Sequence, residues 1–357
     1  MKSVEEEKSA VIEWLLHPHE LGREPYAVEY VKTVTDEEES ECMIFKYKKA
    51  ETEPWLLAIS SESGIFSHME EYDPDTDEKD AIELLTALKQ FWKNKAAEAE
   101  EREDRAKKAG AFLAFVLLKA PEWDHERFEK DFEADWGVNL DPPELKDGEN
   151  NSTIVYSTQG SDVGAIFAVS LIDRCVPNEE AEYHAQFNYM WKEAVSVTKT
   201  HKAHMIVTVL SKTDPVTSGT LFAQVLSTLC KWENTLGVYY NDVVAEPRFL
   251  VAVSDLIRQD QFPLPSLVWF GLGRSWKGVN AYTCGLTKFG KDELEILESD
   301  KDPGELRGFL MNIAAYVIGQ DVILHDGETI GVSNEQRIKI VRSEGVNVQG
   351  DSLKIMY

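Results

Sequence analysis

The sequence predicts an α+β protein built from more than one domain. Runs of apolar, strand-like residues alternate with amphipathic helical stretches along most of the chain. Its 357 residues are enough for two or three domains, and 43% of them are hydrophobic, which is enough apolar material for buried cores. We divide the chain into a small α+β domain at residues 1–75, a spacer helix at 76–109 and a larger α/β domain at 110–357.

The first domain is predicted to contain one helix followed by strands. Val11, Trp14 and Leu15 recur at helical spacing, so we expect a helix over residues 4–15. Polar turns separate the runs that follow, which predicts three or four strands. These runs lie at residues 26–33, 42–47, 54–60 and 64–69.

A long helix is predicted over residues 78–108. Its second half contains no large apolar residue and is held by acid–base pairs four residues apart, such as Glu98 with Arg102. Because this half has nothing to bury, we expect it to be a solvated spacer between domains. The first half is amphipathic, and its apolar face comprises Ala81, Leu84, Leu85, Leu88, Phe91 and Trp92.

The first half of the large domain, residues 110–211, predicts a ferredoxin-like unit. Its elements follow the order β-α-β-β-α-β, which is the ferredoxin-like plan. The run at 111–118 is apolar without alternation, as expected of a strand that is covered on both faces. The predicted elements are a strand at 111–118, a helix from Asp124 to Trp136, strands at 152–158 and 163–172 around a turn at Gly160, a helix at 178–200 and a strand at 205–210.

The helix predicted at residues 178–200 carries two columns of side chains at helical spacing, and Asn178 is expected to cap it. We expect the more apolar column to be buried and the other to flank it. The buried column is Tyr183, Phe187, Met190, Ala194 and Val197, and the flanking column is His184, Asn188, Trp191, Val195 and Thr198.

The second half of the large domain, residues 212–357, is predicted to be a second α/β unit. It includes Asp326-Gly327, a dipeptide typical of a tight hairpin. Because the strands of the first half lack polar alternation, we expect this half to pack on their second face. Helices are predicted at 220–233, 247–258 and 306–318, and strands at 237–240, 267–272, 279–286, 322–324, 329–332, 337–342 and 353–357.

The composition is strongly acidic, with 64 acidic and 37 basic residues and a net charge of −27. Such a charge repels phosphate backbones and anionic lipids, so we expect neither a nucleic-acid nor a membrane partner. A basic protein partner fits better, and the alternative is that acidity only maintains solubility. The four cysteines form no CxxC pair, and the N-terminus lacks the apolar core of a signal peptide. We therefore expect a cytoplasmic protein with buried thiols and no cofactor.

Several strings in the C-terminal part resemble those of a bacterial family. They are NYMWKEAVSVTKTHKAHMIVTVL (188–210), YTCGLTKFGKDELEIL (282–297), DGETIGVS (326–333) and RSEGVNVQGDSLKIMY (342–357). On these strings, residues 110–357 resemble the domain-of-unknown-function family numbered 4261, and residues 1–109 carry no resemblance that we recognise. The resemblance implies a cytoplasmic bacterial protein and no particular activity or catalytic residue.

Three histidines form a weak candidate metal site. His201 and His204 are three residues apart at the predicted end of the long helix, and with His184 and an acidic residue they could bind zinc or iron. The spacing identifies no third ligand, and such side chains at a helix C-terminus also complement its dipole. His184, Asn188 and Trp191 could instead line a small-molecule pocket, or be hydrogen-bonded structural residues.

The predicted turn between the strands at 267–272 and 279–286 is a candidate interface. Arg274, Trp276 and Lys277 lie in it, and an exposed tryptophan beside basic residues is typical of protein interfaces. The preceding Gly271-Leu272-Gly273 leads into a strand and not a helix, so we expect the glycines to permit close packing or a bulge instead of dinucleotide binding. Two carboxylates flank the turn at 326–329, and a hairpin explains them without a function.

Our leading hypothesis is a non-enzymatic interaction protein that sequesters a basic partner, for example an immunity or antitoxin-type factor. It depends on the charge of −27 and on the lack of a catalytic signature such as GxSxG. One alternative is an enzyme, metal-dependent or otherwise, with a site among His184, His201, His204 and the turn at 326–329. Another is a small-molecule binding module on the face of His184, Asn188 and Trp191. The oligomeric state is left open.

Overall fold

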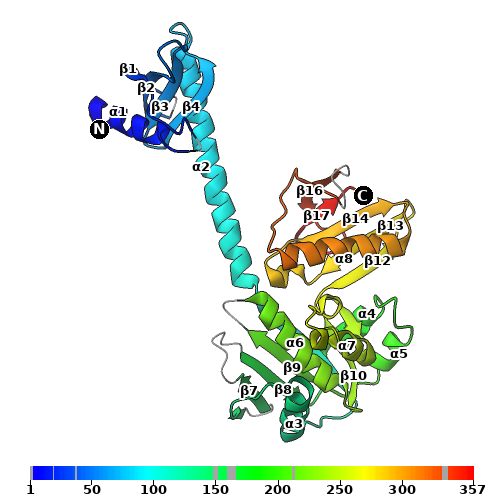
Figure 1. Ribbon diagram of the computed structural model, residues 1–357. Helices are drawn as coiled ribbons and strands as arrows, with labels where there is room; N and C mark the ends of the chain where they lie inside the picture. The colour runs from blue at the N-terminus through cyan, green and yellow to red at the C-terminus, as the bar shows by residue number, and fades with distance from the viewer. Residues whose placement is uncertain are drawn as a thin grey trace. The chain divides into compact units, whose positions relative to one another are not determined.

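The helices and strands form two compact units, and the predicted α+β class is confirmed (Figure 1). The computed structural model describes residues 3–18, 20–36, 38–147, 152–158, 166–210, 214–331 and 337–357. Residues 1–103 form one unit and residues 104–357 the other, and the boundary lies within helix α2 (Asp77–Lys108). The predicted limits of the small domain and the spacer helix stay predictions.

The N-terminal unit is an antiparallel sheet with a helix against each face (Figure 1). Helix α1 (Val4–Leu15) begins as predicted, and Ser3 and Glu6 cap it by accepting from each other's backbone N–H. Its buried Val11 and Leu15 lie in the core on one side of the sheet. The strands pair in chain order and are β1 (Ala27–Thr35), β2 (Glu41–Lys48), β3 (Leu56–Ser61) and β4 (Gly64–Glu71).

Helix α2 covers the other face of this sheet with only part of its predicted apolar face. Ala81 and Leu85 are fully buried, and Leu88 is the last described buried residue of the helix. Phe91 and Trp92 belong to the predicted apolar face, yet they are 50% and 53% exposed. The apolar face of α2 therefore extends past Leu88, its last described buried residue.

The C-terminal unit contains a seven-stranded sheet in which every neighbouring pair is antiparallel. Its order is β11-β10-β5-β9-β8-β7-β6. The strands are β5 (Ala111–Leu118), β6 (Glu144–Asp147), β7 (Ser152–Ser157), β8 (Ile166–Ile172), β9 (Ala203–Leu210), β10 (Thr235–Tyr240) and β11 (Val243–Ala245). The start of the predicted strand at 163–172 and the turn at Gly160 lie outside the described residues.

Helices lie on both faces of this sheet. Figure 1 shows α6 across one face, where it shares a core with α3 and α7. Against the other face, at the end of β5 and beside β10 and β11, lie two short helices. The helices are α3 (His125–Trp136), α4 (Glu180–Ala185), α5 (Ala194–Thr198), α6 (Pro215–Cys230) and α7 (Pro247–Ser254).

The element order predicted for residues 110–211 is present, with β6 added, but the ferredoxin-like strand arrangement is wrong. In a split βαβ plan, the strands joined by a helix run parallel with one strand between them. Here β9 lies between β5 and β8 and pairs antiparallel with both, so β8 and β9, which α4 and α5 connect, are direct neighbours, and two strands lie between β5 and β7. The reason is that α3 and the pair α4/α5 cover opposite faces, which the order of elements does not specify.

The long helix predicted at residues 178–200 is interrupted. Asn178 has a φ of 59° in a 3₁₀ turn (Pro177–Glu179) and does not cap a helix, and α4 and α5 are separated by turns. The Oδ1 atom of Asn188 accepts hydrogen bonds from the backbone N–H groups of Met190 (3.0 Å) and Trp191 (3.1 Å). Such a side chain offers the backbone an alternative to helical bonding, which explains the break.

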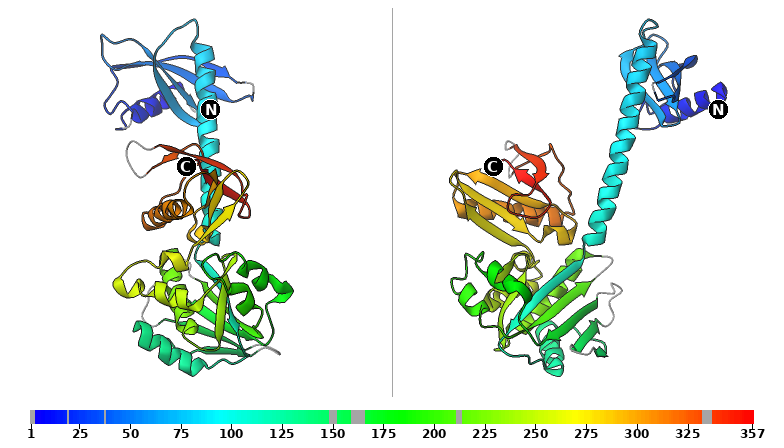
Figure 2. Two further views of the ribbon diagram at one scale, coloured as in Figure 1. Left: turned by 90° about the vertical axis from the view of Figure 1, so that its right-hand side faces the viewer. Right: turned by 180° about the vertical axis from the view of Figure 1, so that it is seen from behind.

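A second sheet, of order β12-β13-β14-β17-β16-β15, lies with α8 (Pro303–Gly319) against its β12 and β13 (Figure 2). Its strands are β12 (Trp269–Arg274), β13 (Val279–Cys284), β14 (Glu293–Ser299), β15 (Thr329–Ile330), β16 (Ile338–Glu344) and β17 (Asp351–Ile355). Strand β14 was not predicted. The hairpin predicted around Asp326-Gly327 is wrong, because residues 322–324 are not a strand and β15 pairs with β16. Val332 lies outside the described residues.

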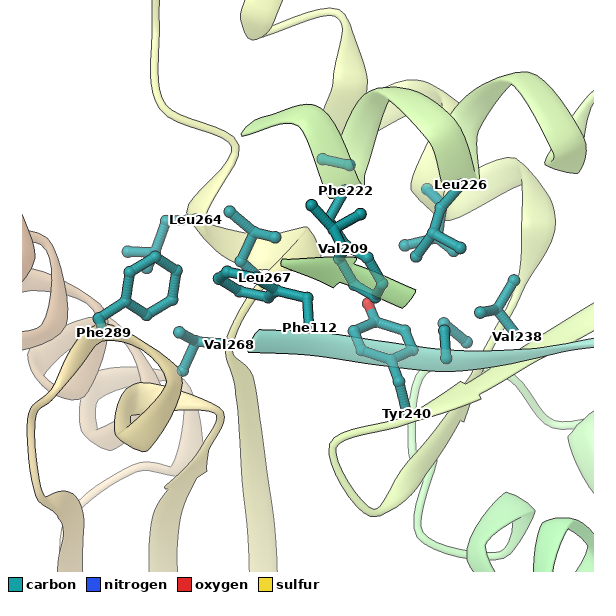
Figure 3. Close-up of a cluster of buried hydrophobic side chains, with 14 of the residues drawn as sticks. Phe112, Val209, Phe222, Leu226, Val238, Tyr240, Leu264, Leu267, Val268 and Phe289 are labelled. Carbon is teal, nitrogen blue, oxygen red and sulfur yellow. The ribbon is translucent and has the colours of Figure 1, made fainter. Parts of the chain in front are cut away.

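The two sheets share one continuous core (Figure 3). Phe112 of β5 and Phe289 contact each other with ring centroids 5.4 Å apart. A Cβ atom on Gly219 of α6 would lie 3.1 Å from Leu267 and 3.2 Å from Phe112, so glycine permits this close approach. Because α6, α7, β10 and β11 belong with the first sheet, the predicted boundary after residue 211 does not fall between the sheets.

Candidate functional site

The predicted site residues lie in different parts of the C-terminal unit. His184 is on α4, Asn188 and Trp191 are in the turns that follow it, and His204 is on β9. Arg274, Trp276 and Lys277 lie at the end of β12 and in the turn to β13. The turn at 326–329 belongs to the second sheet, where Asp326 accepts from the backbone N–H of Arg342 at 2.8 Å.

Asn188 and Trp191 are buried and bonded within the fold. Their side chains are 7% and 9% exposed. Besides the two hydrogen bonds that break the helix, Asn188 donates from Nδ2 to the carbonyl of Val244 on β11 at 2.8 Å. Hollows of about 550 and 770 Å³ in this unit are lined by other residues, near Trp123 and near Phe309. Small-molecule binding at His184, Asn188 and Trp191 stays a prediction.

Both ring nitrogens of His201 contact backbone groups, and Oε1 of Glu182 also lies 3.5 Å from its Nδ1 atom. Its Nε2 atom accepts from the N–H of Val176 at 2.9 Å, and its Nδ1 atom lies 2.6 Å from the carbonyl of Thr198. Burial lowers the pKa of His204, whose Nδ1 atom bonds to the carbonyl of Arg174. Within the described part of the chain, no three His, Cys, Asp or Glu side chains are grouped to hold a metal ion. These contacts support the structural interpretation of both histidines.

Exposed aromatic rings gather instead on α4 and in the turn that follows it. We define the aromatic surface as Tyr183, His184 and Phe187 with Tyr239 of β10. Tyr183 is 59% and Phe187 39% exposed, and their ring centroids lie 5.3 Å apart at an interplanar angle of 81°. The ring of His184 stacks on Tyr239 at 5.1 Å. These mutual contacts hold the exposed rings in place.

Acidic groups surround the aromatic surface. Glu179 and Glu180 are exposed at the start of α4, and the hydroxyl of Tyr239 donates to Oε1 of Glu180 at 2.6 Å. Burial, and then the Glu180 carboxylate, raise the pKa of Tyr239, so this hydroxyl keeps its proton at neutral pH. Nδ1 of His184 bonds to the carbonyl of Asp242 at 3.0 Å. The arrangement offers ring faces and carboxylates to a cationic group.

The sequence analysis predicted the opposite pattern of burial for most of these side chains. Tyr183, Phe187 and Met190 were predicted to be buried, but each is more than a third exposed, whereas Asn188, Trp191 and Thr198 of the flanking column are buried. Helical periodicity does not extend across the break at Asn188, and α4 buries its small residues Ala181 and Ala185. An asparagine within the predicted helix was the signal that could have indicated the break.

The turn between β12 and β13 presents the expected exposed tryptophan. Trp276 is 89% exposed, and Nζ of Lys277 lies 5.1 Å from the ring centroid. Lys277 also pairs with Glu298 at 3.0 Å. The expected close packing at Gly271 is also present, because a Cβ atom there would lie 2.2 Å from Cζ of Tyr282. A role of this turn as an interface stays a prediction.

The sequence analysis did not predict two buried carboxylates on β14. Glu293 accepts from the hydroxyl of Thr283 and the N–H of Gly285, both at 2.7 Å. Glu295 accepts from the Ser352 hydroxyl at 2.6 Å and from the N–H of Val346 at 3.0 Å. Both groups are enclosed by donors from the second sheet, so their arrangement is structural.

Comparison with known proteins identifies one segment. Residues 282–356 match the family described as Domain of unknown function (DUF4261), which confirms the resemblance over that segment. No curated protein and no solved structure matches the chain. Among the described helices, none is both long and apolar enough to cross a membrane. The matched segment includes β14 and the turn at 326–329 but not the aromatic surface.

Proposed function

We propose that this protein acts by binding a basic protein at the aromatic surface. The observation that carries the proposal is the pair of exposed rings, Tyr183 and Phe187, that lies beside exposed Glu179 and Glu180. Aromatic rings that are already ordered lose little conformational entropy on binding and are enriched among residues that dominate interface energies. An immunity or antitoxin-type role, in which a basic partner is sequestered, would use such a surface.

The charge of the chain supports a basic partner. Lysine and arginine side chains can lie over aromatic faces and form charge-assisted hydrogen bonds with carboxylates. The net charge of −27 would also accelerate the encounter with a cationic protein, and this effect falls as salt concentration rises. The expected binding is therefore fast and salt-sensitive.

Site-specific photocrosslinking tests this proposal in the native cell. A benzophenone amino acid would replace Tyr183 and, as a matched control, Val346, which is 64% exposed in the loop between β16 and β17. We expect position 183 to give a covalent adduct with one basic protein that position 346 does not give. The purified partner should then bind the Glu179→Gln/Glu180→Gln variant several-fold more weakly at low salt. Identical adducts at both positions, or none, would overturn the proposal.

A further inference from the structure

Among the described residues of β5, β9, β8 and β7, one face of the seven-stranded sheet carries no charged side chain. We call it the uncharged face and define it by twelve positions that the strand register places in rows. In the first row, Ala111 pairs with Leu210, and Leu210 with Ile166. The twelve are Ala111, Leu113 and Phe115 of β5, Ile206, Thr208 and Leu210 of β9, Ile166, Ala168 and Ser170 of β8, and Thr153, Val155 and Ser157 of β7.

This face is partly exposed to solvent, whereas the opposite face of the same strands is buried. Leu113 is 44%, Ile166 48% and Leu210 54% exposed, and eight of the twelve positions are half-buried, among them Phe115, which packs against the core of α4 and α5. The alternate residues, such as Phe112 and Val209, are at most 2% exposed under α6 and α3. The right-hand view of Figure 2 shows the molecule from behind, so the face of these strands that is turned away from α6 points toward the viewer. The prediction that the strand at 111–118 is covered on both faces is therefore wrong at Leu113.

An open face without charge is unusual on this chain. Charged residues make up 28% of the sequence, and they are concentrated at the surface of proteins in general. Contiguous exposed apolar residues with a polar rim mark interaction sites. The register places Glu144 and Lys146 of β6 beside Val155 and Thr153, at the margin of the face. The face thus has the composition of an interface centre.

We propose that the uncharged face binds a second copy of this chain. Two copies that each carry −27 repel one another, and here they could meet with no charged residue at the twelve positions and with carboxylates only at the margin of the contact. A basic partner would find carboxylates only at the margin of this face, at Glu144 and Asp141. A two-fold axis would place the same residues on both sides, as in the face-to-face packing of sheets about 10 Å apart. The uncharged face adjoins the aromatic surface where Phe115 stacks on Tyr239 at 5.7 Å, but the exposed rings Tyr183 and Phe187 are not among its twelve positions.

The size of the face indicates a weak dimer. Four strands about 4.8 Å apart and six residues of about 3.3 Å each span roughly 20 Å by 20 Å. Such an area is about half of what one partner contributes to a standard interface, roughly 800 Å². We therefore expect a reversible dimer that is populated at tens to hundreds of micromolar.

Sedimentation velocity of the full chain over about 1–300 µM tests the dimer. Because the contact is apolar and the chains repel, raising NaCl from about 0.05 to 0.5 M should strengthen it. Leu210→Glu should raise the dimer dissociation constant at least tenfold by placing like charges in the contact. Met356→Glu adds the same charge at a residue that is 65% exposed elsewhere and should change the constant less than twofold.

The outcomes separate this inference from the proposed function. A chain that stays monomeric over the whole range, or a dimer weakened by salt, would overturn the second-copy proposal and leave the aromatic surface untouched. Equal effects of Leu210→Glu and Met356→Glu would also reject this face. Circular dichroism checks that both variants are folded, and Leu210→Thr offers a strand-compatible substitution if Leu210→Glu does not fold.

Discussion

Glu295 and Lys354 form an ion pair of 2.9 Å between neighbouring parallel strands, β14 and β17. The carboxylate is fully buried, and it also accepts from the backbone N–H groups of Val346 and Asn347. One buried side chain therefore joins two strands of the second sheet to the loop that connects β16 and β17.

Removing this charge should destabilise the second sheet. Glu295→Gln leaves the Lys354 ammonium without its buried partner, so we expect a loss of about 3 kcal/mol or more in the free energy of unfolding. Urea unfolding measures the loss, and hydrogen exchange should rise first in residues 345–350. The matched control is Glu298→Gln, because Glu298 pairs at the surface with Lys277. A Glu295→Gln variant as stable as that control would contradict the assigned role.

The buried Glu295 carboxylate should also make the stability of the protein depend on pH. Burial alone would raise the pKa of Glu295, but hydrogen bonds from Ser352, Val346, Lys354 and Asn347 lower it from 4.5 to about 2. A depressed pKa stabilises the fold above the unfolded value, and this stabilisation is lost as pH falls through the folded value. The difference in stability between wild type and Glu295→Gln should therefore shrink between about pH 4.5 and pH 2. A difference that does not change over this range would refute the assignment.

Gly271 and Gly273 provide a matched pair on one strand. A Cβ atom on Gly271 would overlap the ring of Tyr282, whereas at Gly273 nothing lies within 4 Å. We expect Gly271→Ala to cost about 1–3 kcal/mol of stability and Gly273→Ala much less. In the double variant with Tyr282→Ala, the cost of Gly271→Ala should largely disappear, as a double-mutant cycle would show. Additive costs would mean that the ring is not the obstacle.

The role of the Asn188 side chain at the break in the predicted helix can be tested by replacing it with alanine. Asn188→Ala leaves the Val244 carbonyl and two N–H groups without their partner, so we expect a loss of about 1–3 kcal/mol. Gln186→Ala, at an exposed neighbouring position, should be close to neutral. Thermal unfolding by circular dichroism compares the two, and equal midpoints would contradict a structural role of the Asn188 amide.

Replacement of two tryptophans by alanine should change the stability of the protein to very different extents. Trp191 is 9% exposed in a core, and Trp191→Ala should cost about 3–5 kcal/mol. Trp276 is 89% exposed, and Trp276→Ala should change stability by less than about 0.5 kcal/mol. Urea unfolding measures both. A large loss on Trp276→Ala would show that this ring supports the fold and is not available as an interface.

Much of the local structure was predictable because its causes are local. The predicted helix at residues 4–15 coincides with α1, and the amphipathic stretches near 220–233 and 306–318 correspond to α6 and α8. The exposure of Trp276 followed from its position in a turn. The aromatic surface was not predictable, because Asn188 interrupts the periodicity through hydrogen bonds, one of which reaches β11.

The sequence by itself determined the α+β class, most helices and strands and the acidic charge, since these depend on periodicity and composition. Only the tertiary structure decided the strand order, the exposed side of α4 and the burial of Glu293 and Glu295. A carboxylate resembles a surface residue in sequence, and the donors that make its burial favourable come from distant positions such as Ser352. Contacts between distant residues, which no local pattern encodes, selected the faces that are covered and those left open.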